Sequence, residues 1–164
     1  FMLENAHAIE DAGAAWVTVH ARTKADGYTP PAFWDQLQPI REALKINVIA
    51  NGEIWNNADA KQCRLESGCQ DLMIGRAAVT TPDITQCIRK NTDEALITWN
   101  ELIQLQIRFL SGPYKKEINM VGRYKQWLGM MSKHYPEAKA LWNEIKRVKA
   151  LDEIAQQLKY HAQS

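Results

Sequence analysis

Three short apolar runs constrain the fold of this chain more than any other feature. They span residues 14–19, 46–50 and 71–74, and each is too apolar to leave one face in water. Such runs are typical of parallel strands that are covered on both faces. Helical patterns alternate with these runs, at residues 1–12, 34–44, 57–67 and 82–90. The alternation predicts an α/β fold with a parallel sheet.

Several residues mark the ends of the predicted helices. Gly13 and Gly68 follow the first and third helical patterns, where glycine commonly ends a helix. Thr81 is the expected N-cap of the fourth helix, and Pro82 is its expected first residue.

Polar residues or glycines stand at the end of every apolar run. The segments are His20-Ala21-Arg22-Thr23, Asn51-Gly52-Glu53 and Gly75-Arg76. In (β/α)8 barrels the active site lies at the carboxyl ends of the strands. The loops that follow the seventh and eighth strands often hold a phosphate there. We therefore expect residues 1–93 to form the C-terminal part of a TIM barrel, namely its last three βα units. Three strands cannot close a barrel, so the other strands are expected upstream of Phe1.

Each of these segments has a second interpretation. Gly52 lets the backbone approach a ligand, with polar contacts from Asn51 and Glu53, but the tripeptide also occurs as an ordinary turn. Gly75 and Arg76 together suit a phosphate, although an arginine after a strand is often only a surface residue.

The segment after the first run has alternatives of its own. His20 can donate a hydrogen bond to a flavin or a substrate, or it can simply fix a loop. The polar loop that follows carries Lys24 and Tyr28, a cation and an aromatic ring that could hold a nucleotide.

The strand patterns stop near Asn91, and only helices are predicted beyond that residue. The helical patterns cover residues 99–109, 116–135, 136–146 and 151–161. We expect residues 94–164 to form a separate all-α helical-bundle domain.

Charge is distributed unevenly along the chain. Residues 1–94 contain 9 Lys/Arg and 13 Asp/Glu, whereas residues 95–164 contain 11 and 6. The basic C-terminal part is suited to a polyanion, with an ordinary solvated helical surface as the alternative. Arg123 and Lys125 lie beside Trp127, a combination that fits phosphate contacts and base stacking, although Trp127, Leu128 and Met131 are also expected in a core.

Composition argues against several other classes of protein. No apolar run approaches the roughly 20 residues of a membrane helix. The three cysteines form no CxxC pair and the four histidines are scattered, so we expect no metal site and reduced thiols in the cytoplasm.

Four ordered motifs resemble the tRNA-dihydrouridine synthase family. They are Val19-His20-Ala21-Arg22-Thr23-Lys24 with Gly27-Tyr28, residues 48–54, residues 72–78, and Arg123-Tyr124-Lys125-Gln126-Trp127-Leu128. The last motif is similar to the bacterial C-type members in particular. Ala21 and Ala77 stand where glycine is expected in close relatives, which is a mild departure.

The resemblance implies a flavoprotein that acts on tRNA. It implies that FMN is bound by His20, Asn51, Gly52, Glu53, Gly75 and Arg76. It also implies tRNA contacts from Arg22, Lys24, Tyr28, Arg123 and Lys125. The resemblance further implies that NADPH reduces the flavin and that a D-loop uracil, at position 16 for the C-type, receives a hydride from it. In the family a cysteine protonates the neighbouring carbon.

The expected proton donor has no counterpart in this sequence. In the family the cysteine lies in an Asn-Cys-Gly-Cys-Pro type motif upstream of these strands, whereas Cys63 and Cys87 fall on predicted helices and Cys69 precedes a strand. We therefore expect no catalytic residue here and no activity from this chain alone. Two alternatives stay open: another FMN-binding barrel oxidoreductase, and a non-catalytic tRNA-binding fragment.

Overall fold

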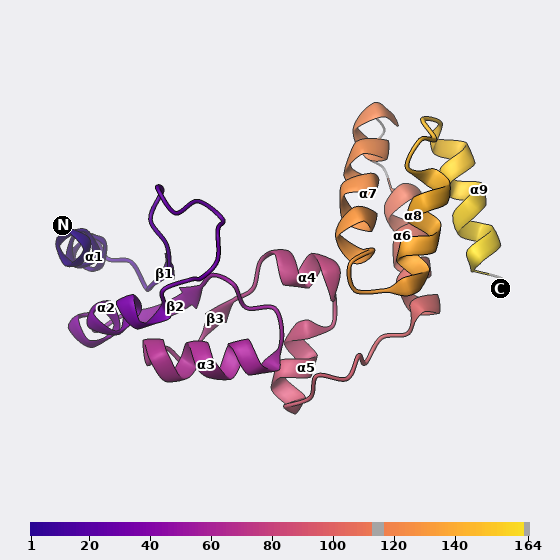
Figure 1. The fold of residues 1–164 in the computed structure, drawn as a ribbon. Helices are drawn as coiled ribbons and strands as arrows, with labels where there is room; N and C mark the ends of the chain where they lie inside the picture. The colour runs from indigo at the N-terminus through magenta and orange to yellow at the C-terminus, as the bar shows by residue number, and fades with distance from the viewer. Residues whose placement is uncertain (113–116, 163–164) are drawn as a thin grey trace. The chain divides into compact units, whose positions relative to one another are not determined.

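The computed structural model describes residues 1–112 and 117–162, which belong to two compact units (Figure 1). The first unit contains Phe1–Ala78 and Ile84–Glu94, and the second contains Val79–Asp83 and Ala95–Ser164. Helix α4 (Arg76–Thr80) spans the division between them.

The first unit is an α/β structure built on a parallel sheet. Its elements, in chain order, are α1 (Met2–Asp11), β1 (Trp16–His20), η1 (Trp34–Leu37), α2 (Gln38–Ala43), β2 (Asn47–Asn51), α3 (Asn57–Ser67), β3 (Leu72–Met73) and α5 (Ile84–Lys90). The strands follow the order β1-β2-β3, and both neighbouring pairs are parallel. The predicted α/β class and parallel sheet are therefore confirmed.

Helices cover only one face of this sheet. Val48 and Ala50 of β2 are fully buried, and Val17 and Val19 of β1 pack against the same core. The opposite face is open, since β1 alternates between exposed and half-buried residues and Trp16 is 61% exposed. The prediction that both faces are covered is wrong for these strands, because no described element packs on the second face.

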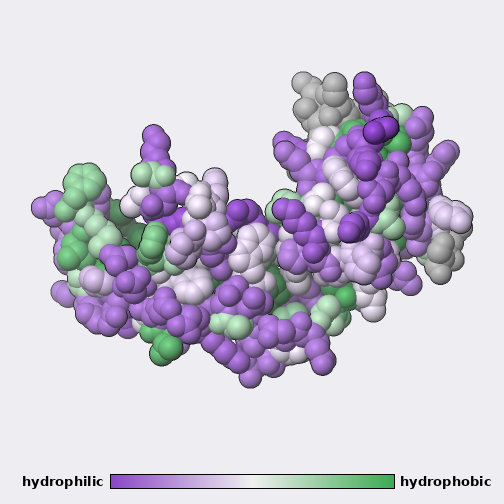
Figure 2. Space-filling view, viewed as in Figure 1, coloured by the Kyte–Doolittle hydropathy of each residue, from purple (hydrophilic) through white to green (hydrophobic). Residues whose placement is uncertain are grey.

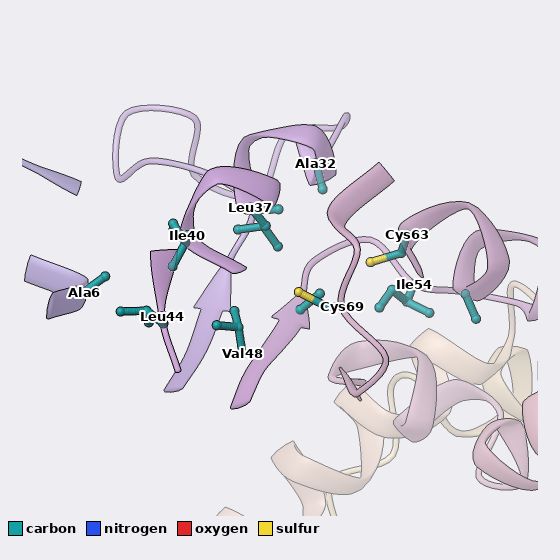
Figure 3. Packing of buried hydrophobic residues seen from close by; sticks show 12 residues of the cluster. Ala6, Ala32, Leu37, Ile40, Leu44, Val48, Ile54, Cys63 and Cys69 are labelled. Carbon is teal, nitrogen blue, oxygen red and sulfur yellow. The ribbon is translucent and has the colours of Figure 1, made fainter. Parts of the chain in front are cut away.

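The core between the sheet and its helices consists largely of small and aliphatic residues. Figure 3 shows Leu37, Ile40, Val48 and Cys63 among its side chains. Apolar residues of α1 contribute little, since Ala6 is its one buried residue. Figure 2 shows hydrophobic surface over this N-terminal part, where Phe1, Met2, Leu3 and Ile9 are exposed.

The structure corrects two predicted helices. The pattern 34–44 forms a 3-10 turn followed by α2, because Pro39 has no N–H with which to continue an α-helical ladder from η1 into α2. The helix predicted at 82–90 begins later, at Ile84, so Thr81 is not its N-cap. Thr81, Pro82 and Asp83 form a bend and turn instead, and the carboxylate of Asp83 accepts hydrogen bonds from the backbone N–H groups of Leu96 and Ile97.

Other boundaries agree closely with the sequence patterns. Gly13, with φ of 87°, follows α1, and Gly68, with φ of 69°, caps α3 in the left-handed conformation that glycine tolerates. The side chain of Asn56 caps the other end of α3 by accepting a hydrogen bond from the Asp59 N–H at 2.8 Å.

The second unit is built mainly from helices. They are α6 (Trp99–Leu110), α7 (Glu117–Met131), α8 (Pro136–Ile145) and α9 (Leu151–His161). Thr98 and Glu101 form a capping box at the start of α6, as each side chain accepts from the other's backbone N–H. The predicted start of the second helix at Lys116 lies outside the described residues, and its end falls at Met131, before Tyr135.

Aliphatic and aromatic side chains from all four helices form the core of this unit. Leu128 and Met131 are fully buried, as expected from the sequence. Tyr124 is also fully buried, and its hydroxyl donates to Gln106 Oε1 at 2.8 Å. Within the described ranges 1–112 and 117–162, no helix has the length and apolar character needed to cross a bilayer.

Candidate functional site

The strand register brings three residues into line at the carboxyl edge of the sheet. His20 pairs with Asn51, and Asn51 pairs with Met73. The Asn51 side-chain amide donates to the Met73 carbonyl at 2.7 Å, and the Ala21 N–H donates to the Asn51 carbonyl at 2.8 Å. Hydrogen bonds on both sides therefore fix Asn51 at the centre of this edge.

A strained turn follows Asn51 directly. Gly52 has φ of 126° and Glu53 has φ of 51°, so two successive residues adopt conformations that most side chains avoid. A Cβ atom at Gly52 would lie 3.2 Å from the Cβ of Ala32, so a larger residue would have to displace Ala32 as well as adopt this strained φ. The Trp34 indole N–H donates to the Gly52 carbonyl at 2.8 Å and holds the turn in place.

The turn directs the Glu53 carboxylate into a cluster of donors. Its Oε1 atom lies 2.8 Å from Nη2 of Arg22 and also pairs with Nη2 of Arg76. Its Oε2 atom accepts a hydrogen bond from the Trp55 indole N–H at 2.7 Å. One carboxylate thus joins residues from the three segments that follow the three strands, with Arg76 at the start of α4.

These contacts determine the protonation of Glu53. Burial by itself raises the pKa of this carboxyl, but the Trp55 hydrogen bond and the two guanidinium groups outweigh burial and hold the pKa below the ordinary 4.5. Glu53 is therefore a carboxylate at neutral pH.

Arg76 lies between two aromatic rings. Its guanidinium carbon is 5.1 Å from the ring centroid of Tyr28 and 5.1 Å from that of Trp55, within the range of cation–π contact. The Arg76 side chain is 43% exposed, so it keeps donors available to a ligand.

These groups line a pocket of about 270 Å³ at the carboxyl edge. Its walls are His20, Tyr28, Asn51, Gly52, Glu53, Ile54, Trp55, Met73, Gly75, Arg76 and Ala77. All six residues that the sequence analysis assigns to FMN binding lie in this wall. A Cβ atom at Gly75 would meet no described atom within 4 Å, so packing of the chain does not require glycine there.

The residues expected to contact tRNA from the first unit occupy different environments. Tyr28 lies at the pocket and is 74% exposed, and Lys24 is exposed on the loop that a Thr23–Asp26 hydrogen bond shapes. Arg22 differs, because its side chain is fully buried by the pair with Glu53 and by donation from Nε to the Pro31 carbonyl at 3.1 Å. The structure thus leaves no exposed guanidinium at Arg22 to meet tRNA.

The two cations expected to contact tRNA from the second unit also differ. Arg123 is exposed on α7. The Lys125 ammonium instead donates to the carbonyl oxygen of Lys146 at 3.0 Å and to that of Val148, so it holds the turn between α8 and α9. Figure 2 shows hydrophilic residues over much of the visible surface of this unit.

Trp55 and Met73 line the pocket although neither is predicted as a site residue. Trp55 follows the Asn51-Gly52-Glu53 turn by two residues, and Met73 lies within the motif at residues 72–78, so these positions are the signal in the sequence. Their contacts with Arg76 and Asn51 join strand ends that are distant in sequence.

None of the three cysteines lines this pocket, and all three are buried. Burial raises the pKa of the Cys63 thiol to about 11 and also raises that of Cys69. Cys87 directs its sulfur toward the Glu94 carbonyl at 3.5 Å. No cysteine among residues 1–112 and 117–162 is therefore placed to donate a proton in the pocket.

Comparison with known proteins decides the family. The dihydrouridine synthase family profile matches residues 1–164. The chain belongs to the dihydrouridine synthase family. The resemblance inferred from the four sequence motifs is thereby confirmed.

Named members of the dihydrouridine synthase family show the same likeness. The tRNA-dihydrouridine(16) synthase of Shewanella oneidensis is 41% identical over 160 residues, which cover 95% of this chain and 50% of that protein. The tRNA-dihydrouridine(16) synthase of Pseudomonas syringae is 41% identical, and the match covers 93% of this chain and 50% of that protein. The one of Haemophilus influenzae is 37% identical, and the match covers 92% of this chain and 49% of that protein. The chain spans about half the length of these curated relatives.

Proposed function

We propose that the chain is part of a cytoplasmic tRNA-dihydrouridine synthase that reduces uridine 16 of the D-loop, with FMN as cofactor and NADPH as reductant. One observation carries the proposal. The six residues selected from sequence as FMN ligands line a single pocket of about 270 Å³ at the carboxyl edge of a parallel sheet. The names of the relatives supply the substrate and the position.

The donors of the pocket suit a flavin mononucleotide. Arg76 is a partly exposed guanidinium, the group that grips phosphate oxygens most effectively. The space over Gly75 would admit a phosphate to the backbone. Tyr28 and Trp55 offer aromatic surface, and His20 offers a ring nitrogen at the end of β1. We assign FMN to His20, Asn51, Gly52, Glu53, Gly75 and Arg76.

The open face of the sheet supports a barrel. In a (β/α)8 barrel the inner strand face packs against other strands, and the outer face packs against helices. Here the exposed residues Trp16, Thr18 and His20 alternate along β1 with residues that pack under the helices. We propose that this face is the barrel interior, covered by further strands in the working enzyme, and that residues 94–164 form the helical tRNA-binding domain.

Each part of the site has a defined task in this proposal. The bound flavin would supply the hydride for the uracil ring. Asn51 and Glu53 orient the pocket wall, Arg76 neutralises phosphate charge, and His20 holds a polar contact at the strand end. The proton for the neighbouring carbon would come from a cysteine outside this set, because the buried thiols of Cys63, Cys69 and Cys87 do not line the pocket.

The lack of a thiol at the pocket leads to a first test. We expect the purified 164-residue chain to form no dihydrouridine when it is supplied with FMN, NADPH and unmodified tRNA. Dihydrouridine formation at a measurable rate would overturn this expectation. The same observation favours a second candidate function, in which this chain binds tRNA without catalysis.

tRNA affinity measured at several salt concentrations tests the RNA-binding part of the proposal. Loss of a phosphate contact in Arg123→Ala should weaken binding and lower the salt slope by about one. We expect the same for Lys125→Ala, because the carbonyl oxygens of Lys146 and Val148 accept from two of the three N–H donors of the Lys125 ammonium and leave the third for a phosphate. Tyr28→Ala and Lys24→Ala should have smaller effects. The matched control is Lys159→Ala, which removes an exposed cation of α9. Equal effects from all three helical-domain variants would show that only overall charge matters and would overturn the assigned contacts.

A further inference from the structure

Arg22 is an unusual arginine because its whole side chain is buried. Nη2 lies 2.8 Å from Glu53 Oε1, Nε donates to the Pro31 carbonyl at 3.1 Å, and the side chain is 0% exposed. Nη1 and Nη2 are both buried, and neither has a hydrogen-bond partner among the described residues, so Nη2 meets Glu53 as an ion pair. Burying a guanidinium is costly unless a nearby anion compensates its charge. Glu53 is the anion that does so.

Glu53 serves a second arginine at the same time. Oε1 forms ion pairs with both Arg22 and Arg76, and of these two arginines only Arg76 reaches the pocket with an exposed part. One carboxylate between two guanidinium groups leaves the cluster with a net charge of plus one. Without Arg22, the full charge of Glu53 would fall on Arg76 and make the cluster neutral.

The cluster also has a defined geometry. Arg76 is stacked between Tyr28 and Trp55, and Trp55 donates to the second oxygen of Glu53 at 2.7 Å. Arg22 approaches Glu53 from loop residues that follow β1, whereas Arg76 approaches from the residues after β3. Removing Arg22 therefore affects the charge felt at Arg76 without removing any group that lines the pocket.

We infer that Arg22 is a positioning residue of the phosphate subsite: by sharing the Glu53 carboxylate, it leaves Arg76 with net positive charge toward the ligand. The inference rests on the proposed function, because the phosphate is that of FMN. This role takes the place of the tRNA contact expected for Arg22, because the buried guanidinium offers tRNA no surface. A purely structural ion pair would stabilise the fold but would not discriminate a phosphorylated from an unphosphorylated flavin.

The test compares FMN with riboflavin, which lacks the phosphate, in the full-length protein. Arg22→Met should weaken FMN binding by about tenfold, the size expected for one charge-assisted contact, and should change riboflavin binding much less. Arg22→Lys should restore most of the preference for FMN. The double variant Arg22→Met/Glu53→Gln should restore part of it, since it again leaves Arg76 as the uncompensated charge. Lys61→Ala, which removes an exposed cation of α3, should leave the preference unchanged.

The Trp55 indole N–H resonance gives a readout that needs no flavin. It should move in Arg22→Met and return toward its original position in Arg22→Lys, because Glu53 accepts from Trp55. An unmoved resonance, an unchanged ratio of FMN to riboflavin affinity, or a loss of tRNA affinity with that ratio intact would each overturn the inference. Failure of the wild-type protein to prefer FMN over riboflavin, with the indole response present, would instead count against the proposed function.

Discussion

The first unit leaves one face of its sheet in solvent, whereas the second unit encloses its core among helices. Trp16 and Met73 on the sheet are 61% and 52% exposed, whereas Leu128, Met131 and Leu141 in the core of the second unit are each 0% exposed. For charged side chains the contrast is reversed, since a buried ion pair lies in the first unit and exposed cations lie in the second. The first unit concentrates paired charges around Glu53, while cations such as Arg123 stand exposed on the second.

This difference separates two ways of building a binding surface. A pocket that must hold a flavin needs side chains fixed to within a fraction of an ångström, and a buried ion pair provides that rigidity. A surface for a polyanion needs only exposed charge on a stable support. If stability and binding divide between the units in this way, substitutions in the two units should have different effects.

The largest effect is expected in the enclosed core. Leu128→Ala should lower the free energy of unfolding by about 2 to 5 kcal/mol, because it opens a cavity at a fully buried position. Leu65→Ala, at a side chain that is 77% exposed in the first unit, should change it by less than about 0.5 kcal/mol. Urea denaturation measures both. Comparable losses for the two variants would contradict the described packing.

The next effect concerns the paired charges of the first unit. Glu53→Gln leaves the buried Arg22 guanidinium without its anion, so we expect a loss of about 2 to 3 kcal/mol, moderated by the 14% exposure of the Glu53 side chain. Glu42→Gln on the exposed surface of α2 is the control and should be nearly neutral. A Glu53→Gln variant as stable as the wild-type protein would show that the ion pairs contribute nothing.

A smaller effect should appear in the pH dependence of stability. The pKa of Glu53 is lower in the folded protein than in the unfolded chain. Ionised Glu53 therefore makes its full contribution to the free energy of unfolding above the ordinary pKa of 4.5. This contribution is lost as the pH falls through the lowered pKa of the folded state. Glu10, Asp26 and Glu101 also have lowered pKa values, so the difference between the wild-type protein and Glu53→Gln isolates Glu53. That difference should narrow on acidification, and a constant difference would contradict the assignment.

The smallest effect should be the labelling of thiols in the native protein. Cys63, Cys69 and Cys87 are buried, and the raised pKa of Cys63 keeps it a thiol at neutral pH. A thiol reagent should modify none of them at pH 7 and all three in denaturant. Rapid labelling of one cysteine in the native state would show an accessible thiol that the described structure does not contain.

Local patterns were sufficient to predict most elements. Apolar runs and glycine helix ends give the three strands and most helix boundaries within one or two residues, because these signals depend on neighbours in sequence. The break at Pro39 was missed since the apolar spacing of residues 34–44 continues through it. The open sheet face could not be predicted, as coverage depends on which elements pack there.

The candidate site was predictable as a set of positions but not as a network. The parallel alternation places His20, Asn51 and Gly75 at one edge, and that conclusion needs only the sequence. Arg22 and Glu53 are separated by 31 residues in the sequence. No local sequence pattern predicts that Arg22 is buried or that it pairs with Glu53. Roles in FMN and tRNA binding stay predictions.

FMN affinity of a Gly75→Val variant in the full-length protein tests the central claim most directly. A Cβ atom at Gly75 meets no described atom and its backbone needs no positive φ, so the free energy of unfolding should be unchanged. FMN affinity should nevertheless fall by at least about tenfold, because the added side chain occupies the space assigned to the phosphate. Unchanged FMN affinity in a normally folded Gly75→Val protein would contradict the assignment of this pocket to FMN.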